Sequence, residues 1–251
     1  MIMLNILWRN VKWRIKNPLA IIIPVLQPLI WLVLYSVIGN QALQDTGIGN
    51  YTAFILPGLV VLVTFGACSS SGMINLVMKS NGSFFRILIA PISRSSIVLG
   101  QILEGVLISF VEVIILFIVS TFFSVRISSD IGGIILIILL IFLTAFFMSG
   151  LANCISLILP NQVIYETIMT AIVLPVFFLS SALFPVENLS NGLKVAVMIN
   201  PFTHIINALR SLMLGNTVVF WRIFPVILLF TVMCICSFLL AKWRLKKETT
   251  H

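Results

Sequence analysis

Residues 132–159 read GGIILIILLIFLTAFFMSGLANCISLIL, a mostly apolar run without a charged side chain. A transmembrane helix needs about 20 mostly apolar residues to cross the hydrocarbon core of a bilayer. This stretch is long enough to cross. Gly132–Leu159 is therefore predicted to be a membrane span, and much of the remaining chain follows the same pattern.

The composition of the whole chain agrees with lipid as its main solvent. The 251 residues are 60% hydrophobic and only 9% charged, and their mean hydropathy is +1.19. A water-soluble core of this size could not bury so much apolar surface. The sequence therefore predicts an all-α integral membrane protein, a single domain over residues 1–251 with six transmembrane helices. The other five spans are predicted at Leu19–Gly39, Thr52–Met78, Leu99–Phe123, Val163–Ala182 and Ile223–Ala241.

The net charge of +8 is distributed in a way that indicates membrane topology. Lys and Arg lie beside the ends of the apolar runs and form no patch with interleaved aromatic residues, so no nucleic-acid partner is expected. With a cytosolic N-terminus, the cytosolic segments hold eleven of the fifteen Lys and Arg residues. The positive-inside rule thus favours a multi-pass protein with both termini in the cytosol.

The segment before the first span, residues 1–18, has the pattern of an amphipathic helix. Leu4, Trp8, Val11 and Ile15 recur at helical spacing, while basic residues occupy other positions. We expect an interfacial helix on the cytosolic membrane surface. The alternative is a frayed segment whose charges only set the topology.

The segment between the fifth and sixth spans, residues 183–221, contains two moderately apolar stretches. They are Leu193–Ile199 and Phe202–Leu214, separated by Asn200-Pro201. The first is too short to cross, and the second carries polar and charged side chains that would make a crossing costly. We therefore predict a re-entrant or interfacial helical hairpin on the outer side, where protein or water satisfies the helix ends.

The sizeable cytosolic loop, residues 79–98, contains a short apolar block that ends at Ala90-Pro91. A short helix with exposed aromatic residues suits docking, because apolar anchors fill a partner's groove and arginines meet carboxylates at the rim. The alternative is an amphipathic loop that lies on lipid. The residues expected to make the contact are Phe84, Phe85, Arg86, Leu88, Pro91 and Arg94.

Catalytic and metal-binding motifs are missing from the sequence. It has no phosphate-binding loop, no H-E-x-x-H helix, no Cys/His cluster and no G-x-S-x-G turn. The four cysteines lie within apolar runs and are interpreted as structural thiols. No catalytic residue, metal site or directly bound cofactor is therefore expected, and ATP could drive this chain only through a separate ATPase.

Two stretches carry a resemblance to a known family. The loop sequence FRILIAPISR at Phe85–Arg94 and the downstream sequence PVFFLSSALFPVENL at Pro175–Leu189 are followed by NPFTH at Asn200–His204 and by Ala208-Leu209-Arg210. Together they resemble the permeases of type 2 ABC exporters, a family that exports drugs, polysaccharides and glycolipids. The order of the elements covers essentially the whole chain. Ser181-Ala182 stands where the family commonly has a glycine, which puts the re-entrant backbone geometry in doubt.

The resemblance implies a transmembrane permease subunit in the cell membrane of a prokaryote. Two ABC ATPase subunits would bind ATP and Mg, and a second permease, identical or homologous, would complete the conduit. Residues 79–98 would act as the coupling helix, and alternating access would move an amphipathic drug, peptide, lipid or glycan-lipid out of the cytoplasm or inner leaflet. The outer hairpin residues implied by the resemblance are Pro185, Glu187, Asn200, Pro201 and Arg210.

Two other classes of protein compete with this interpretation. The first is a non-pumping membrane immunity or assembly protein that binds an amphipathic peptide. The second is an intramembrane enzyme that uses Glu104 and Glu112 as an acid–base pair, but no nucleophile or metal site accompanies them.

Polar residues within the predicted spans are candidates for a translocation pathway or a dimer seam. For Glu112 a pathway role and a structural hydrogen bond are equally compatible with the sequence. For Glu104 the structural role is favoured, and Glu166 is interpreted as a solvated or hydrogen-bonded helix-start residue. Glu187 and Arg210 are a candidate ion pair within the outer hairpin. The pathway candidates are Glu112, Ser69, Ser70 and Gln27.

Overall fold

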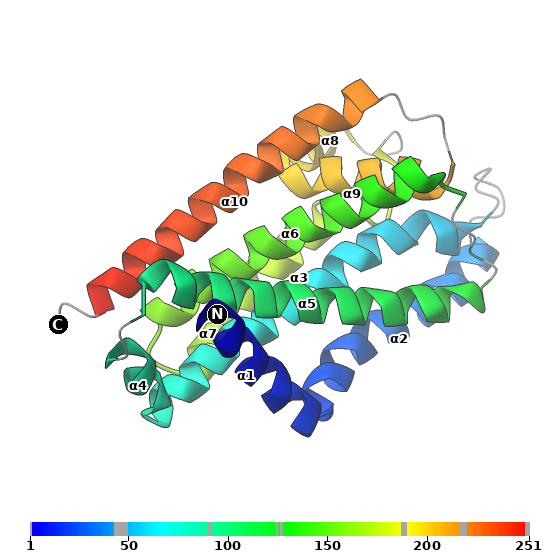
Figure 1. Ribbon diagram of the computed structural model, residues 1–251. Helices are drawn as coiled ribbons and strands as arrows, with labels where there is room; N and C mark the ends of the chain where they lie inside the picture. The colour runs from blue at the N-terminus through cyan, green and yellow to red at the C-terminus, as the bar shows by residue number, and fades with distance from the viewer. Residues whose placement is uncertain are drawn as a thin grey trace.

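The computed structural model describes residues 2–42, 50–89, 92–123, 125, 128–186, 190–215 and 220–248. All secondary structure in these ranges is helical and amounts to ten helices (Figure 1). The all-α prediction is therefore confirmed for the described part of the chain.

Four helices are long and apolar enough to cross a membrane. They are α3 (Tyr51–Ser80), α5 (Arg94–Thr121), α6 (Ile131–Ile158) and α10 (Phe220–Glu248). They correspond to four of the six predicted spans, because uninterrupted apolar runs of this length are the strongest signal for a transmembrane helix.

The first predicted span lies in a bent pair of helices. α1 (Ile2–Lys16) and α2 (Leu19–Ala42) meet at Asn17-Pro18, and their described parts are inclined by 70°. Taken together, the pair is long and apolar enough to count as a fifth candidate span. Pro18 favours the break, because the residue before a proline is disfavoured in the helical region.

The fifth predicted span is shorter in the structure than in the prediction. α7 (Gln162–Phe178) has 17 residues and ends before Ala182, because the next residues form turns. The Asn200 side chain donates to the carbonyls of Val176 and Leu179 at 2.7 and 2.8 Å, and these bonds satisfy groups at the end of the helix. Six crossings thus remain a prediction.

The core is organised around α3, which packs against α2, α5, α6, α7 and α9, while α10 packs mainly along α6. Glycine permits several of these approaches. A Cβ atom at Gly105 would lie 2.5 Å from Ser149 Oγ, and one at Gly58 would lie 2.6 Å from Ala182 Cβ. The small residues therefore serve close helix packing, as is common in membrane bundles.

Three short helices complete the described structure. α4 (Ser83–Ile89) follows α3, and α8 (Asn191–Ile199) and α9 (Pro201–Met213) occupy the segment between α7 and α10. The break between α8 and α9 falls at Asn200, where the sequence indicated it. Figure 1 shows α4 and the C-terminal end of α10 at one end of the bundle, with α8 and α9 towards the other.

The first helix presents two different faces. Leu4, Trp8 and Ile15, which the sequence pattern assigned to one apolar face, are 57%, 62% and 64% exposed. Asn10 and Arg14 are buried against the bundle instead. The helix at Ile2–Lys16 is present, and its location at a membrane surface remains a prediction.

Candidate functional site

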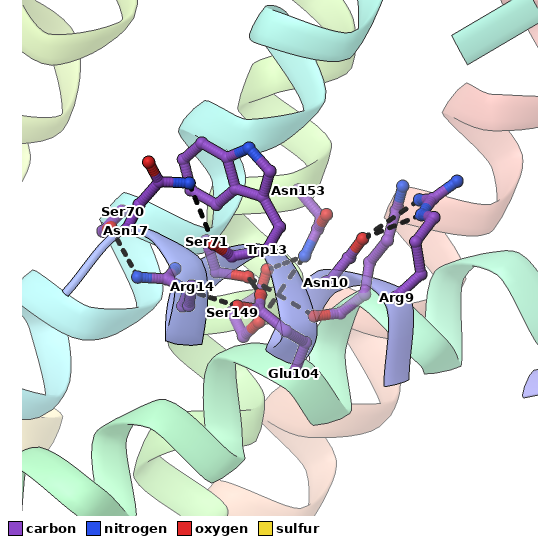
Figure 2. Close-up of polar contacts among 11 residues, drawn as sticks. Arg9, Asn10, Trp13, Arg14, Asn17, Ser70, Ser71, Glu104, Ser149 and Asn153 are labelled. Atoms are coloured by element: carbon purple, nitrogen blue, oxygen red, sulfur yellow. Dashed lines mark hydrogen bonds and ion pairs between the residues drawn. The ribbon is translucent and has the colours of Figure 1, made fainter. Parts of the chain in front are cut away.

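A buried ion pair fixes α1 to the bundle (Figure 2). Arg14 Nε lies 2.5 Å from Glu104 Oε1, and the two side chains are 0% and 1% exposed. Arg14 Nη1 donates to Ser70 Oγ at 3.0 Å, and Ser71 Oγ donates to the second carboxylate oxygen of Glu104. Each charge is therefore neutralised and hydrogen-bonded, which is the condition under which a buried pair is tolerated.

Further buried polar contacts join α3, α5 and α6 close to this pair. Gln101 Nε2 donates to Asn75 Oδ1 at 2.6 Å. Asn75 Nδ2 donates to Asn153 Oδ1 and, at 3.3 Å, to Ser156 Oγ. Such side-chain bonds between helices favour one relative register, because each polar group would otherwise lie unpaired in apolar surroundings.

The sequence indicated only part of this arrangement. The hydrogen bond from Ser71 agrees with the structural role expected for Glu104. The partner Arg14 was interpreted only as a charge that sets topology. The signal that could have found it is the cost of a carboxylate within a span, which calls for a cation, together with the Asn10–Arg14 spacing of one helical turn.

The loop expected to dock a partner forms α4 and has an inner and an outer side. Phe84 is 1% exposed, and Lys79 Nζ lies 5.9 Å from the centroid of its ring. Phe85 is 61% exposed, and Arg86 beside it is also exposed. Arg94 Nη1 donates to the Leu88 carbonyl at 3.1 Å and so holds the end of the loop.

The six docking candidates therefore divide by position. Phe84, Leu88 and Arg94 support the loop, whereas Phe85 and Arg86 are directed outwards. Pro91 lies outside the described residues. An outward-facing aromatic residue next to an arginine is typical of a protein-binding surface.

The candidate residues of the outer hairpin mainly form hydrogen bonds between elements. Arg210 donates from Nε to the Phe54 carbonyl at 3.0 Å and from Nη2 to the Ser181 carbonyl at 2.6 Å. Its guanidinium lies 3.8 Å from the centroid of the Phe54 ring. The candidate partner Glu187 lies outside the described residues.

The start of α9 is formed as its sequence suggests. Asn200 caps the helix, with Oδ1 accepting from the Phe202 amide at 3.0 Å, and Pro201 occupies the first turn. His204 Nε2 lies 3.0 Å from the Met198 carbonyl, which is a bond within the hairpin. Pro185 is half-buried in the preceding loop.

A cleft of about 300 Å³ lies between α2, α3 and α7. Gln27 of α2 and Ser69 of α3 line it, together with Glu166 and Thr170 of α7. The structure thus brings two of the four pathway candidates into one cleft. Ser70 belongs instead to the ion-pair network.

The fourth pathway candidate, Glu112, is not part of the cleft lining. Its side chain is fully buried in α5, and neither carboxylate oxygen has a hydrogen-bond partner among the described residues. The described residues therefore do not provide the hydrogen bond to another span that was one of the two interpretations of Glu112. A buried polar group without a partner is costly, so Glu112 is an unusual position in the core.

The wall formed by α7 is fixed to α3 by Tyr165. This residue is fully buried, and its hydroxyl donates to the Ser69 carbonyl at 2.8 Å. The neighbouring Glu166 is exposed and has no hydrogen bond or ion pair within the described structure. Of the two forms that the sequence allowed for Glu166, solvated or hydrogen-bonded, its exposure agrees with the solvated one.

The described residues contain no group of three or more His, Cys, Asp or Glu side chains that could hold a metal ion. The four cysteines are free thiols, and two of them, Cys68 and Cys234, are buried.

The fold and these sites define a class of polytopic helical membrane protein with a short exposed helix, α4, and a cleft between α2, α3 and α7. Comparison with known proteins gives the family. The model for the ABC-2 type transporter family matches residues 3–214. The chain therefore belongs to the ABC-2 type transporter family.

Individual relatives agree with this assignment. A putative transport permease, ycf38, of Cyanophora paradoxa is 26% identical over 200 residues, which cover 78% of this chain and 69% of the relative. The daunorubicin resistance ABC transporter permease protein DrrB1 of Streptomyces coeruleorubidus is 23% identical over 217 residues, covering 86% and 76%. Nodulation protein J of Neorhizobium galegae is 23% identical over 224 residues, covering 84% and 81%. Family membership makes the chain a transport permease subunit, and it implies an ABC ATPase as partner.

Proposed function

We propose that this chain is the permease of an ATP-driven exporter that moves an amphipathic molecule out of the cytoplasm or inner leaflet. The observation that carries the proposal is α4, which presents Phe85 and Arg86 outwards on a chain whose sequence has no phosphate-binding loop. Such a subunit needs a surface through which a separate ATPase can drive it.

The proposed topology places α4 and both termini in the cytosol, with α1 on the membrane surface. The six crossings are α2, α3, α5, α6, α7 and α10, and the hairpin α8–α9 lies on the outer side. The exposed apolar face of α1, with Trp8 62% exposed, supports contact with lipid. The proposed location is the cell membrane of a prokaryote.

The proposed assembly contains two permease chains and two ATPase subunits, with ATP and Mg bound on the ATPases. Phe84 is packed inward, and α4 contacts α3. A displacement of α4 by the closing ATPases would therefore be transmitted to α3, which contacts five other helices of the bundle. Alternating access would follow if the bundle has two discrete packings.

The substrate class is supported by the cleft and by the relatives. Apolar walls with a few polar groups suit a molecule that has both an apolar body and a polar head. One relative is named for daunorubicin resistance and another for nodulation, so the family does not define a single substrate. The proposed substrate is an amphipathic organic molecule.

The test is co-purification from native membranes in mild detergent. Wild type should bring an ABC ATPase at a stoichiometric level, and the F85A/R86A variant should lose it while still inserting into the membrane. W221A/R222A is the matched control, because it also removes an adjacent exposed aromatic residue and arginine, at the start of α10. Full ATPase recovery with F85A/R86A would refute the docking assignment.

A further inference from the structure

We infer that the cleft between α2, α3 and α7 binds a cationic head group and that the Glu166 carboxylate recognises it. The inference rests on the proposed function, since it names the class of substrate that the permease would carry.

Among the described residues, Glu166 is the one charged side chain on the cleft lining, and no Lys or Arg of this part of the chain lines it. The other polar side chains on the lining are neutral: Gln27, Ser69 and Thr170. Apolar residues from the three helices, among them Phe65, form the rest. A site of this kind can hold the apolar body of a ligand against its walls and still select a positively charged head group, because the carboxylate attracts it.

The Glu166 carboxylate is available for a ligand. It is exposed, and no hydrogen bond or ion pair involves it within the described structure. Two other carboxylates are already engaged, since Glu104 pairs with Arg14 and Asp130 accepts from the Gly133 amide at 2.8 Å. A carboxylate beside apolar walls attracts a cation more strongly than one in open water, because the local dielectric is lower.

The backbone around Glu166 is held in place before any ligand arrives. Tyr165 is bonded to the Ser69 carbonyl at 2.8 Å, and Met169, one turn further along α7, is also buried. Glu166 therefore lies on the exposed face of a helical turn that Tyr165 anchors to α3. Binding then costs little ordering of the main chain.

A more open depression continues along α7 from the cleft. Glu166, Thr170 and Leu174 line both hollows, and Pro175 extends the second one towards the end of the helix. The continuous surface gives an elongated molecule room beyond its head group. The cleft volume of about 300 Å³ suits a small head group rather than a folded polymer.

The experiment measures binding of two fluorescent probes to the permease in nanodiscs of phosphatidylcholine alone. Both probes carry the same fluorophore and decyl chain; one ends in trimethylammonium and the other in a hydroxyl group. Signal from empty nanodiscs is subtracted. Wild type should bind the cationic probe about fivefold more tightly than the neutral probe, as expected for a partly solvated charge pair.

The E166Q variant should lose this preference and bind the two probes equally, with the affinity for the neutral probe unchanged. The E166K variant should favour the neutral probe. D130N is the matched control, because it removes a carboxylate outside the cleft and leaves an amide that still accepts a capping bond. Equal binding of both probes by wild type, or a preference that survives in E166Q, would overturn the inference.

The same preparation separates this inference from the proposed function. Association with the ATPase depends on α4 and not on Glu166. A permease that has the cation preference but no ATPase partner would refute the proposed function alone. One that binds the ATPase but shows no preference would refute this inference alone.

Discussion

Replacing Arg14 with methionine should lower the free energy of unfolding by about 3–5 kcal/mol. The Nε and Oε1 atoms of Arg14 and Glu104 lie 2.5 Å apart, and the side chains are 0% and 1% exposed. Methionine retains an unbranched apolar side chain but leaves the Glu104 carboxylate buried without a cation. That uncompensated charge, more than the lost attraction, produces the expected loss.

A double-mutant cycle isolates the ion pair. E104Q should also destabilise, because it leaves the Arg14 charge without its carboxylate. The R14M/E104Q variant removes both charges, so its loss should be smaller than the sum of the two single losses by about 2 kcal/mol. Unfolding is followed by far-UV circular dichroism during an SDS titration in mixed micelles.

Arg9 provides the matched control on the same helix. Its side chain is exposed and bonds to Asn10 Oδ1 at 3.0 Å, so R9M should cost less than about 1 kcal/mol. R14M should also speed trypsin cleavage at Lys12 and Lys16, because α1 would detach from α3 and α5. A loss in R14M no larger than that in R9M, or strictly additive single losses, would refute the reasoning.

Three further variants test other parts of the described structure in the same SDS titration. E112Q should change stability by less than about 1 kcal/mol, because neither oxygen of Glu112 has a hydrogen-bond partner among the described residues. A loss as large as that of R14M would instead show that the Glu112 carboxylate has a stabilising partner. R210K should cost about 1–3 kcal/mol, because an ammonium group cannot reproduce the bonds from separate guanidinium nitrogens to the Phe54 and Ser181 carbonyls. If R210K were as stable as wild type, these two bonds would not anchor α9. N200A should cost about 1–3 kcal/mol, because it removes the cap and the two bonds donated to the Val176 and Leu179 carbonyls. N200D should cost at least as much, since a carboxylate oxygen would face the same two carbonyls; a smaller loss in N200D than in N200A would contradict the donor role.

The long helices could be predicted from the sequence because their signal is local. An apolar run such as Gly132–Leu159 contains within itself the length and composition that lipid requires. The break at Asn200-Pro201 was equally predictable, since proline favours a first-turn position and asparagine favours a cap. In these cases the sequence signal lies within the helix or turn that it specifies.

The features that could not be predicted depend on residues far apart in the chain. α7 ends at Phe178 with help from Asn200, which is 21 positions beyond Leu179. Arg14 and Glu104 are separated by 90 positions. Helical periodicity assigned Leu4, Trp8 and Ile15 to one apolar face of α1. It could not determine whether that face would pack against the rest of the protein or remain exposed. The cleft was missed for the same reason, because three helices contribute to it.

The three consecutive serines of α3 connect these features physically. The Ser69 carbonyl accepts from Tyr165 and Ser69 lines the cleft, whereas Ser70 and Ser71 bind the two members of the buried ion pair. α4 follows α3 directly and is packed against it through Phe84. A movement of α4 would thus reach one short segment that contacts α1, α5 and α7 together. Within the described residues, the ion pair opposes separation of α1 and α5, whereas one hydrogen bond, from the Tyr165 hydroxyl, joins α7 to α3. The α3–α7 contact, which borders the cleft, should therefore open first.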